Sequence, residues 1–447
     1  ADLGGGIFCS GYTGTSSPVL TNVTFNGNRA FVYGGGMFNS GDSGVSSPVL
    51  TNVTFGGNMA VSGGGMYNSA TNFGTSSPQL VNVIMWGDSA SEDAEIYNDG
   101  ATPDISYSDI DKDGILGTGN IRQDPQFKAP VNASSAPTSS GNYHIRLSSP
   151  AIDAGSPTAC PAPDMDGTAR PLDGNGDGSA ICDMGAYETQ VLFVDVDAAG
   201  GTHDGKTWVS AYTTLQEALD WTNAHNATFF EIWVAKGVYY PDFGGRHVAD
   251  SPSESFHISY DNVQIYGGFA GSETARSQRD PAVHRTILSG DIDGNDTNSD
   301  GNSIAETSAD IQGSNAYHVV YLDGESNEAI TVATVLDGFI ITAGSADDNS
   351  GNSDGGGAYC AGDGNGNGCS PTIANVTFSG NQARKAGGGI TNKGRFGGVS
   401  NPVFTNVTFT GNGAGEFGGG MSNAANGGGT SSPKLTNVIF SGNKAGF

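Results

Sequence analysis

One sequence pattern occurs six times in this chain of 447 residues. It reads Pro-x-Leu-Thr-Asn-Val-Thr-Phe-x-Gly-Asn-x-Ala, with substitutions in some copies, and a run of three glycines follows most copies. The central asparagines lie 30 residues apart in the first three copies and 31 apart in the last three. A fixed period of this length predicts a repeat architecture, in which each copy forms one unit that stacks on the next. The central asparagines are Asn22, Asn52, Asn82, Asn375, Asn406 and Asn437.

The residues around each central asparagine predict a bent strand. Val and Phe follow the asparagine with Thr between them in most copies, a pattern that is typical of a strand with one buried face. The Leu two residues before the asparagine has the opposite parity, so we expect the chain to bend at the asparagine. Asparagine tolerates the left-handed conformation that such a bend needs. Stacked at the same corner, these side chains could bond to each other as a ladder.

Two further features complete the repeat. A glycine five residues after the central asparagine, followed by Asn or by Asp88, predicts a second corner of the same kind. The Gly-Gly-Gly run then starts another strand, led by Met37, Met66, Ile390 or Met421. Three corners and short strands in about 30 residues describe one coil of a parallel β-helix.

Several segments resemble known families. The pairing of Phe-x-Gly-Asn with Gly-Gly-Gly-Met resembles the repeats of polymorphic outer-membrane proteins, which are surface-exposed right-handed β-helices. Residues 148–155 (Ser-Ser-Pro-Ala-Ile-Asp-Ala-Gly) and 182–188 (Cys-Asp-Met-Gly-Ala-Tyr-Glu) are similar to the terminus of bacterial secreted β-helix proteins called choice-of-anchor Q. Their beginning resembles residues 194–201 with Trp208 and residues 214–221, so the order of the halves is permuted here. The resemblance implies an extracellular, all-β, right-handed parallel β-helix.

One helix is expected. Thr214 and Glu217 have the spacing of a capping box, and an apolar stripe predicts a short helix over 214–223 that covers the open end of a solenoid. We therefore divide the chain into five parts. These are 1–95, coils that complete a neighbour's solenoid; 96–190, terminal coils and an Asp-rich candidate calcium-binding end cap; 191–230, start strand and capping helix; 231–345, irregular first coils; and 346–447, regular Gly-rich coils ending in a half coil.

The composition restricts the partners and the compartment. With 46 acidic and 18 basic residues the net charge is −28, which disfavours nucleic acid and anionic membranes as partners. No apolar run approaches the ~20 residues of a membrane helix, so we expect no membrane insertion. The chain starts at Ala1 without a signal peptide, as expected of a processed product or a piece of a longer polypeptide.

The five cysteines favour an oxidising compartment. Cys160 and Cys182 flank the Asp-rich segment, and Cys360 and Cys369 close a Gly/Asn loop, so we expect two local disulfides, with free buried thiols as the alternative. Cys9 would lie three coils from Cys360 across a junction between copies, ~14 Å away at ~4.8 Å per coil. That distance exceeds disulfide reach, and we expect Cys9 to be unpaired.

Three acidic loops have the spacing of calcium ligands. Two match the first half of a calcium loop, although neither has Glu at position 12, and the third is looser. The alternative is that Asp, Asn and Gly simply form turns. Four Asn-Val-Thr sequences match glycosylation acceptors, but their asparagines are the expected buried corners, which favours a structural role. The candidate Ca²⁺ ligands are Asp109, Asp111 and Asp113; Asp173, Asn175 and Asp177; and Asp291, Asp293 and Asn295.

An enzyme is not expected. A polysaccharide lyase, a common activity of β-helices, needs a cation to neutralise a uronate and a nearby base. The seven histidines are scattered, and nothing in the sequence pairs His257 with Arg246. An adhesin or carbohydrate-binding module is the alternative function, because Trp86, Tyr107 and Tyr239 could line a sugar site.

The chain ends favour an extracellular filament or surface layer at the cell surface. Ten residues follow Asn437, and Asn22 lies 22 residues into a next copy, so the step across a junction would be 32. Each end therefore supplies half a coil. The six steps from Tyr187 to Phe193 reach only ~20 Å, whereas the coils of one copy extend at least ~40 Å. We therefore expect other copies of the chain as head-to-tail partners, either separate or in tandem, with surface polysaccharide as a further candidate partner.

Overall fold

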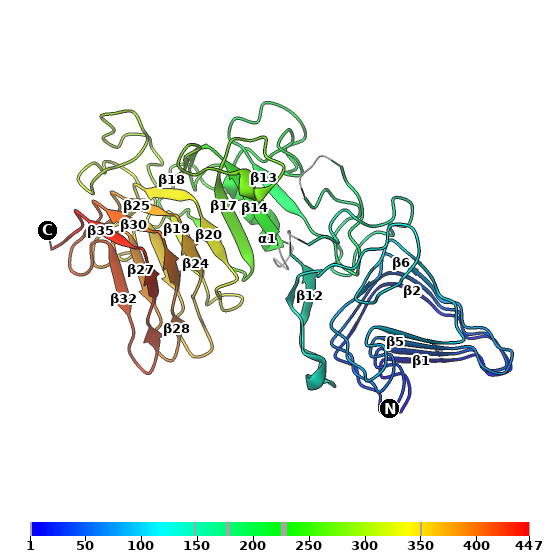
Figure 1. Ribbon diagram of the computed structural model, residues 1–447. Helices are drawn as coiled ribbons and strands as arrows, with labels where there is room; N and C mark the ends of the chain where they lie inside the picture. Colours follow the sequence, from blue (N-terminus) through cyan, green and yellow to red (C-terminus); the bar gives the residue numbers. More distant parts are fainter. Residues whose placement is uncertain (1, 147–148, 176–178, 225–229, 349–350, 447) are drawn as a thin grey trace. The chain divides into compact units, whose positions relative to one another are not determined.

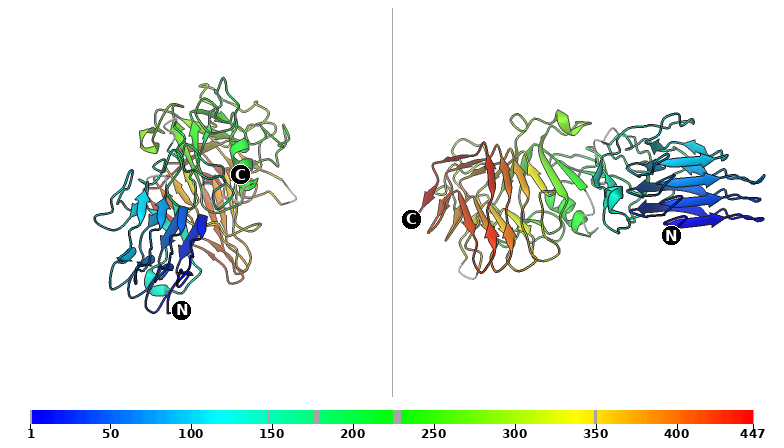
Figure 2. Two further views of the ribbon diagram at one scale, coloured as in Figure 1. Left: turned by 90° about the vertical axis from the view of Figure 1, so that its right-hand side faces the viewer. Right: turned by 60° about the horizontal axis from the view of Figure 1, so that its bottom comes forward.

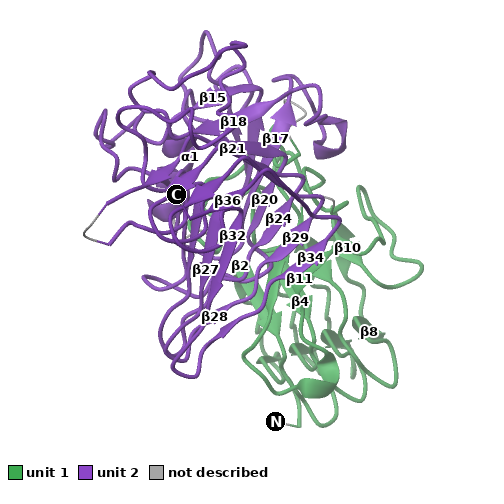
Figure 3. Ribbon diagram, turned by 90° about the vertical axis from the view of Figure 1, so that its left-hand side faces the viewer, with its two compact units in different colours: residues 1–190 green, residues 191–447 purple. Residues whose placement is uncertain are grey.

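The computed structural model of the protein describes residues 2–146, 149–175, 179–224, 230–348 and 351–446. The fold is nearly all β, with strands in several parallel sheets (Figures 1 and 2). The chain divides into two compact units, unit 1 from Ala1 to Gln190 and unit 2 from Val191 to Phe447 (Figure 3). Several parallel sheets are compatible with the all-β fold expected from the repeat.

In unit 1, each successive repeat contributes one strand to a first parallel sheet and one or two strands to a second. The antiparallel pair β11 (Phe127–Ala129) and β12 (Asn142–Ile145), with the 3-10 helix η1 (Ala133–Ser135), follows them. The first sheet has the order β1 (Ile7–Ser10), β3 (Met37–Ser40), β5 (Met66–Ser69) and β8 (Ile96–Asp99), and the second contains β2 (Val19–Asn26), β4 (Val49–Gly56), β6 (Gln79–Val81), β7 (Ile84–Met85), β9 (Asp104–Ser106) and β10 (Asp109–Ile110).

In unit 2, parallel sheets again collect equivalent strands of successive repeats. The longest sheet has the order β13 (Val191–Val194), β14 (Phe230–Ala235), β17 (Val263–Phe269), β20 (Val335–Asp337), β24 (Thr372–Ala374), β29 (Val403–Thr405) and β34 (Lys434–Thr436). A second has the order β15 (Gly237–Tyr239), β18 (Thr286–Ser289), β21 (Phe339–Thr342), β25 (Thr377–Ser379), β30 (Thr408–Thr410) and β35 (Ile439–Ser441). The others are β16 (Phe256–Ile258), β19 (Val320–Asp323), β23 (Ala358–Ala361), β27 (Ile390–Lys393) and β32 (Met421–Ala424); β22 (Ser345–Ala346), β26 (Gln382–Ala383), β31 (Gly413–Ala414) and β36 (Lys444–Ala445); and β28 (Val399–Ser400) with β33 (Thr430–Ser431).

The register aligns equivalent positions of the repeat. Phe378 pairs with Phe409 and Phe409 with Phe440, and the ring centroids of these pairs lie 4.8 and 4.9 Å apart in parallel stacks. Phe25 and Phe55 stack in the same way at 4.5 Å. The predicted inward positions are fully buried in the interior repeats, which confirms the face assignment. They include Leu50, Val53 and Phe55 in unit 1 and Phe404, Val407 and Phe409 in unit 2.

Both predicted corners are present. The central asparagines have positive φ angles between 50° and 56°, as in Asn375 and Asn406, so the chain turns there and brings residues of opposite parity to one core. The glycines at the second corner, such as Gly27 and Gly411, also have positive φ, a conformation that costs glycine little. The predicted asparagine ladder is confirmed: Asn82 Nδ2 donates to Asn52 Oδ1 at 2.8 Å.

The predicted helix is α1 (Leu215–Ala224), within one residue of its expected bounds. Thr214 Oγ1 lies 2.9 Å from Glu217 Oε2, and the Glu217 backbone N–H donates to Thr214 Oγ1, so the capping box is confirmed. α1 packs on β13, β14 and β16. β13 and β16 are the edge strands of their sheets, so the helix covers the first strands of unit 2.

The cysteines pair as expected. Cys160 is bonded to Cys182 and Cys360 to Cys369, with Cα atoms 5.8 and 5.6 Å apart. Cys9 is free and buried.

Residues 96–190 differ in part from the expected end cap. Strands β8 to β10 add one more repeat, and Ile115 packs against the core. The described residues between 127 and 190 instead run along the side of the repeats and bond to the corners through their backbone. Thr138 N–H donates to the Gly27 carbonyl, and Asn82 Nδ2 donates to the Ala159 carbonyl at 2.7 Å. We call the described part of residues 127–190 the side layer. Its apolar residues pack together with Ile84 as a separate cluster; they include Phe127, Tyr143, Ile145, Ile152 and Met184.

Candidate functional site

The last repeat of unit 2 exposes residues that occupy core positions. Phe440 is 49% exposed and Leu435 is 41% exposed, although the equivalent Phe409 and Phe404 of the preceding repeat are fully buried. β34, β35 and β36 are each the last strand of their sheet. These strands therefore present an apolar face together with an unpaired backbone edge, which we call the terminal face.

The first repeat of unit 1 ends its sheets in the same way. β1 is an edge strand, and β2 pairs with β4 only. Leu20 and Val23 are half-buried, whereas Leu50 and Val53 in the next repeat are fully buried. We call β1 and β2 the initial face.

The first-corner ladder has a fixed hydrogen-bond direction. In each described bond the later asparagine donates its side-chain amide to the earlier one: Asn52 to Asn22 at 3.2 Å, and Asn406 to Asn375 and Asn437 to Asn406 at 3.1 Å each. The first corner of the terminal face thus offers the acceptor oxygen of Asn437. At the initial face, the Asn22 amide donates to the Pro163 carbonyl.

The second-corner ladder runs in the opposite direction. Asn28 donates its side-chain amide to Asn58 Oδ1 at 2.8 Å, and Asn412 donates to Asn443 Oδ1 at 2.8 Å. Members of this ladder also donate to the carbonyl of a core residue in the preceding repeat, as Asn58 does to Phe25 at 2.7 Å and Asn381 does to Ile341 at 2.9 Å. The initial face therefore offers the Oδ1 acceptor of Asn28. The terminal face offers the backbone N–H of Asn443.

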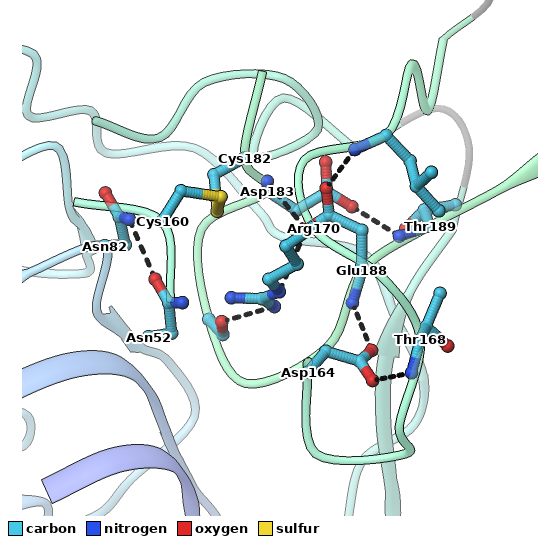
Figure 4. Close-up of polar contacts among 12 residues, drawn as sticks. Asn52, Asn82, Cys160, Asp164, Thr168, Arg170, Cys182, Asp183, Glu188 and Thr189 are labelled. Atoms are coloured by element: carbon cyan, nitrogen blue, oxygen red, sulfur yellow. Dashed lines mark hydrogen bonds and ion pairs between the residues drawn. A yellow bond between two sulfur atoms is a disulfide. The ribbon is translucent and has the colours of Figure 1, made fainter. Parts of the chain in front are cut away.

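A buried polar network holds the side layer together (Figure 4). Arg170 Nε lies 3.0 Å from Glu188 Oε2, and both side chains are fully buried. Asp183 accepts hydrogen bonds from the backbone N–H groups of Asp153 and Thr189, and burial raises the pKa of Asp183 to about 6. The network lies beside the Cys160–Cys182 disulfide and fixes the loops of a segment that has few strands. Asp153, Asp183 and Glu188 belong to the family-like stretches 148–155 and 182–188, whereas no sequence pattern singled out Arg170 or Thr189.

The first candidate calcium loop is occupied by protein contacts. Asp109 lies in β10, fully buried, and accepts a hydrogen bond from the Gln123 backbone. Asp111 pairs with Arg122 at 2.9 Å, and Asp113 pairs with the same guanidinium. Arg122 thus supplies the positive charge beside these two carboxylates, and the structure does not bring the three side chains together on one ion position.

The other two loops are also held by hydrogen bonds. Asn175 N–H donates to Asp153 at 3.0 Å, and Asp177 lies outside the described residues. Asp291 accepts from the Asn295 backbone, while Asp293 accepts from Asn295 Nδ2 at 2.8 Å. Among the residues that the structure describes, no three His, Cys, Asp or Glu side chains gather in a metal-holding group.

Calcium stabilisation of residues 104–187 stays a prediction. We expect a chelator to lower the thermal unfolding midpoint of unit 1, because a bound cation would offset carboxylate repulsion and bind only the folded state. Calorimetry with calcium and with chelator measures this effect. An unchanged midpoint would exclude the prediction.

Asp88 replaces asparagine in the second-corner ladder and forms a buried acid pair with Glu95. The Asp88 N–H donates to Glu95 Oε1 at 3.2 Å, and Asp88 Oδ1 accepts from Asn58. Burial raises the pKa of Asp88 to about 7, and burial together with the charge of Asp88 raises the pKa of Glu95 well above its usual range. The single Asn-to-Asp change in the repeat was the sequence signal for this pair.

This pair predicts that unit 1 is more stable at pH 5 than at pH 8. A raised carboxyl pKa means that the folded state holds protons that the unfolded state releases near pH 4. The stabilisation is therefore complete below about pH 4 and is lost as the pH rises through about 7. Amide hydrogen exchange of β3 and β5 at the two pH values measures it. Asp88→Asn should reduce the difference, and equal protection at both pH values would contradict the prediction.

The residues weighed for catalysis do not converge. His257 Nε2 lies 3.2 Å from Asp323, whereas Arg246 lies 3.6 Å from Asp220. Tyr239 is buried and donates to the Ala235 carbonyl. Trp86 lines a pocket of about 790 Å³ in unit 1, beside Asp124, Phe127 and Arg146.

Comparisons with known proteins give no relative. No family model matches the chain, and it matches none of the curated proteins or solved structures searched. In the described part of the chain, no helix has the length and apolar character needed to cross a membrane.

Proposed function

We propose that the parallel sheets wind as a right-handed β-helix and that the protein is a structural subunit of an extracellular filament or surface layer. In this assembly the terminal face of one copy stacks on the initial face of the next. The observation that carries the proposal is the 49% exposure of Phe440 at a position that is fully buried one repeat earlier. A phenylalanine in this column gains burial only if another repeat covers it.

The register of the two faces supports this stacking. Aligning Asn437 with Asn22 places Leu435 on Leu20 and Phe440 on Phe25. Strands β34 and β35 would then pair with β2, and β32 with β1, in the parallel manner of the interior repeats. The step from Asn437 to Asn22 of the next copy is 32 residues, longer than the 30 or 31 within one copy. The extra residues fall between Ala445 and the first glycine run of the next copy. The equivalent segment already differs in length between repeats.

The ladder directions supply complementary hydrogen-bonding groups. The Asn22 amide would donate to Asn437 Oδ1, continuing the first-corner ladder, and Asn443 would donate to Asn28 Oδ1, continuing the second. If two terminal faces met instead, the Asn437 Oδ1 acceptor of one copy would face the same acceptor of the other copy at the first corner. Directional ladders therefore favour a head-to-tail order, which does not close and propagates as a fibre.

We further propose an extracellular location and a passive structural role. Two disulfides fit an oxidising, extracellular environment, and the scattered histidines support a non-enzymatic protein. Adhesion is the second candidate, favoured by the pocket beside Trp86, where an indole and several polar side chains could contact a surface polysaccharide. Binding of polysaccharide to the assembled material would support that additional role.

Electron microscopy and sedimentation of the purified chain test the proposal. We expect filaments with continuous β density across each junction and one axial repeat per 447 residues. The mass of the dissociated material shows whether units are joined by peptide bonds. A monodisperse monomer at every concentration, with both faces still open, would overturn the proposal.

A further inference from the structure

One outward-facing position of the repeat is apolar in only two copies. It lies two residues after the central asparagine and is Thr24, Thr54, Thr377 or Thr408 in four copies. In the remaining two copies it is Ile84 and Ile439. Threonine suits a strand face that meets water, and isoleucine does not.

Ile84 is covered by the side layer. It is 1% exposed and belongs to the cluster that contains Ile152 and Met184. The chain passes so close that a Cβ on Gly185 would lie 2.8 Å from the Ile84 Cδ1 atom. A second layer of the protein therefore packs on this apolar side chain. The same layer covers Thr54, which is 1% exposed, through a hydrogen bond to its hydroxyl.

In the part of unit 2 that the structure describes, Ile439 has no such cover. It is 58% exposed. A loop does cover the side of the two preceding repeats: the Ser379 hydroxyl donates to the Ala305 carbonyl at 2.7 Å, and Ser308 N–H donates to Gly411 at 2.9 Å. At the equivalent Gly442, the nearest atom that a Cβ would meet is Gly411 N at 3.8 Å, so this loop ends one repeat before Ile439.

Two stretches of the side layer extend along unit 1 to its first repeat, which carries the initial face. Asn82 and Asn22 bond to the carbonyls of Ala159 and Pro163, so this stretch runs from the third repeat to the first. Ala186 N–H donates to Thr54 at 3.0 Å, and the next residue, Tyr187, bonds to Thr24. Both stretches therefore contact the first repeat, which would stack directly on the terminal face of the preceding copy.

We infer that, in the proposed filament, the side layer of the next copy covers Ile439, so that the junction has two layers instead of one. The covering residues are Tyr187 and Met165. Tyr187 stacks on His144 at 3.8 Å. Met165 bonds through its N–H to Ala186 and is 46% exposed. This inference depends on the proposed function, and it assigns the partner surface for a residue outside the β-helical core.

Photo-crosslinking tests the contact directly. A photoreactive amino acid at position 439, in filaments mixed from light and heavy isotope-labelled chains, should crosslink to peptides within 163–187 of another chain. The same amino acid at exposed Val399 is the control and should not reach that segment. Intact filaments whose crosslinks from position 439 lie elsewhere would overturn the inference and leave the filament in place. If the unmodified chain never assembles, the proposed function fails and the inference fails with it.

Ile439→Thr, which introduces the residue found in four of the other repeats, provides a second measurement. It should raise the critical concentration for assembly roughly tenfold, because a half-exposed isoleucine loses its cover. The unfolding midpoint of the unassembled chain should not change, since the side chain is exposed there. Val399→Thr should leave assembly unchanged. An unaltered critical concentration for Ile439→Thr would contradict the two-layer junction.

Discussion

Replacing Phe409 with alanine should lower the unfolding free energy by about 3–5 kcal/mol. Phe409 is fully buried and lies between Phe378 and Phe440, with ring centroids 4.8 and 4.9 Å away. The smaller side chain leaves a cavity in the middle of the stack, which the rigid backbone ladders on both sides cannot close. Denaturant unfolding of the unassembled chain, followed by amide exchange in unit 2, measures the loss.

Phe440→Ala is the matched control for this substitution. The two residues occupy the same column, but Phe440 is 49% exposed, so its removal should cost the unassembled chain clearly less than the Phe409 change. It should weaken assembly instead. Two results would contradict this assignment: equal losses of stability at the two positions, or a loss below about 1 kcal/mol at Phe409. Either one would mean that Phe409 is not a covered core residue and Phe440 not the open end of the same stack.

The repeat predicted those features that depend on local sequence. Each corner needs one residue that accepts a positive φ, and Asn406 or Gly411 meets that need wherever the chain folds. The buried face follows from parity around the corner, and the helix from the capping box of Thr214 and Glu217. Repetition then brings equal residues into register, so the ladders and the phenylalanine stacks follow from the same pattern.

The side layer could not be predicted because its contacts are not local. Asn82 and Ala159 are 77 residues apart, and no periodic pattern connects them. The Asp-rich spacing predicted candidate calcium ligands, but it did not show that Asp111 and Asp113 contact Arg122, which is eleven and nine residues away, respectively. The buried pair of Arg170 and Glu188 likewise depends on the folded loops, since neither residue belongs to a repeat. Residues with irregular spacing acquire their roles only from the tertiary structure.

Leu435→Asp should abolish assembly at concentrations where the unmodified chain forms filaments, with a critical concentration raised more than about 100-fold. Leu435 is 41% exposed, so a carboxylate at this position stays hydrated in the free chain and should change its unfolding midpoint little. In the proposed junction the same carboxylate would lie on Leu20, between two apolar layers. Burying an unpaired charge costs several kcal/mol. Sedimentation of the variant over a concentration series measures the effect.

Two further variants make this test specific. Phe396→Asp places the same charge at a residue that is 60% exposed and one repeat away from the terminal face, and it should assemble normally. Leu20→Lys, combined with Leu435→Asp, should recover part of the assembly, because the register sets the two positions opposite each other and the ammonium would pair with the carboxylate. Recovery depends on this alignment, since a junction shifted by one residue would turn the lysine to the other face. Normal assembly of Leu435→Asp alone would show that the terminal face is not the junction.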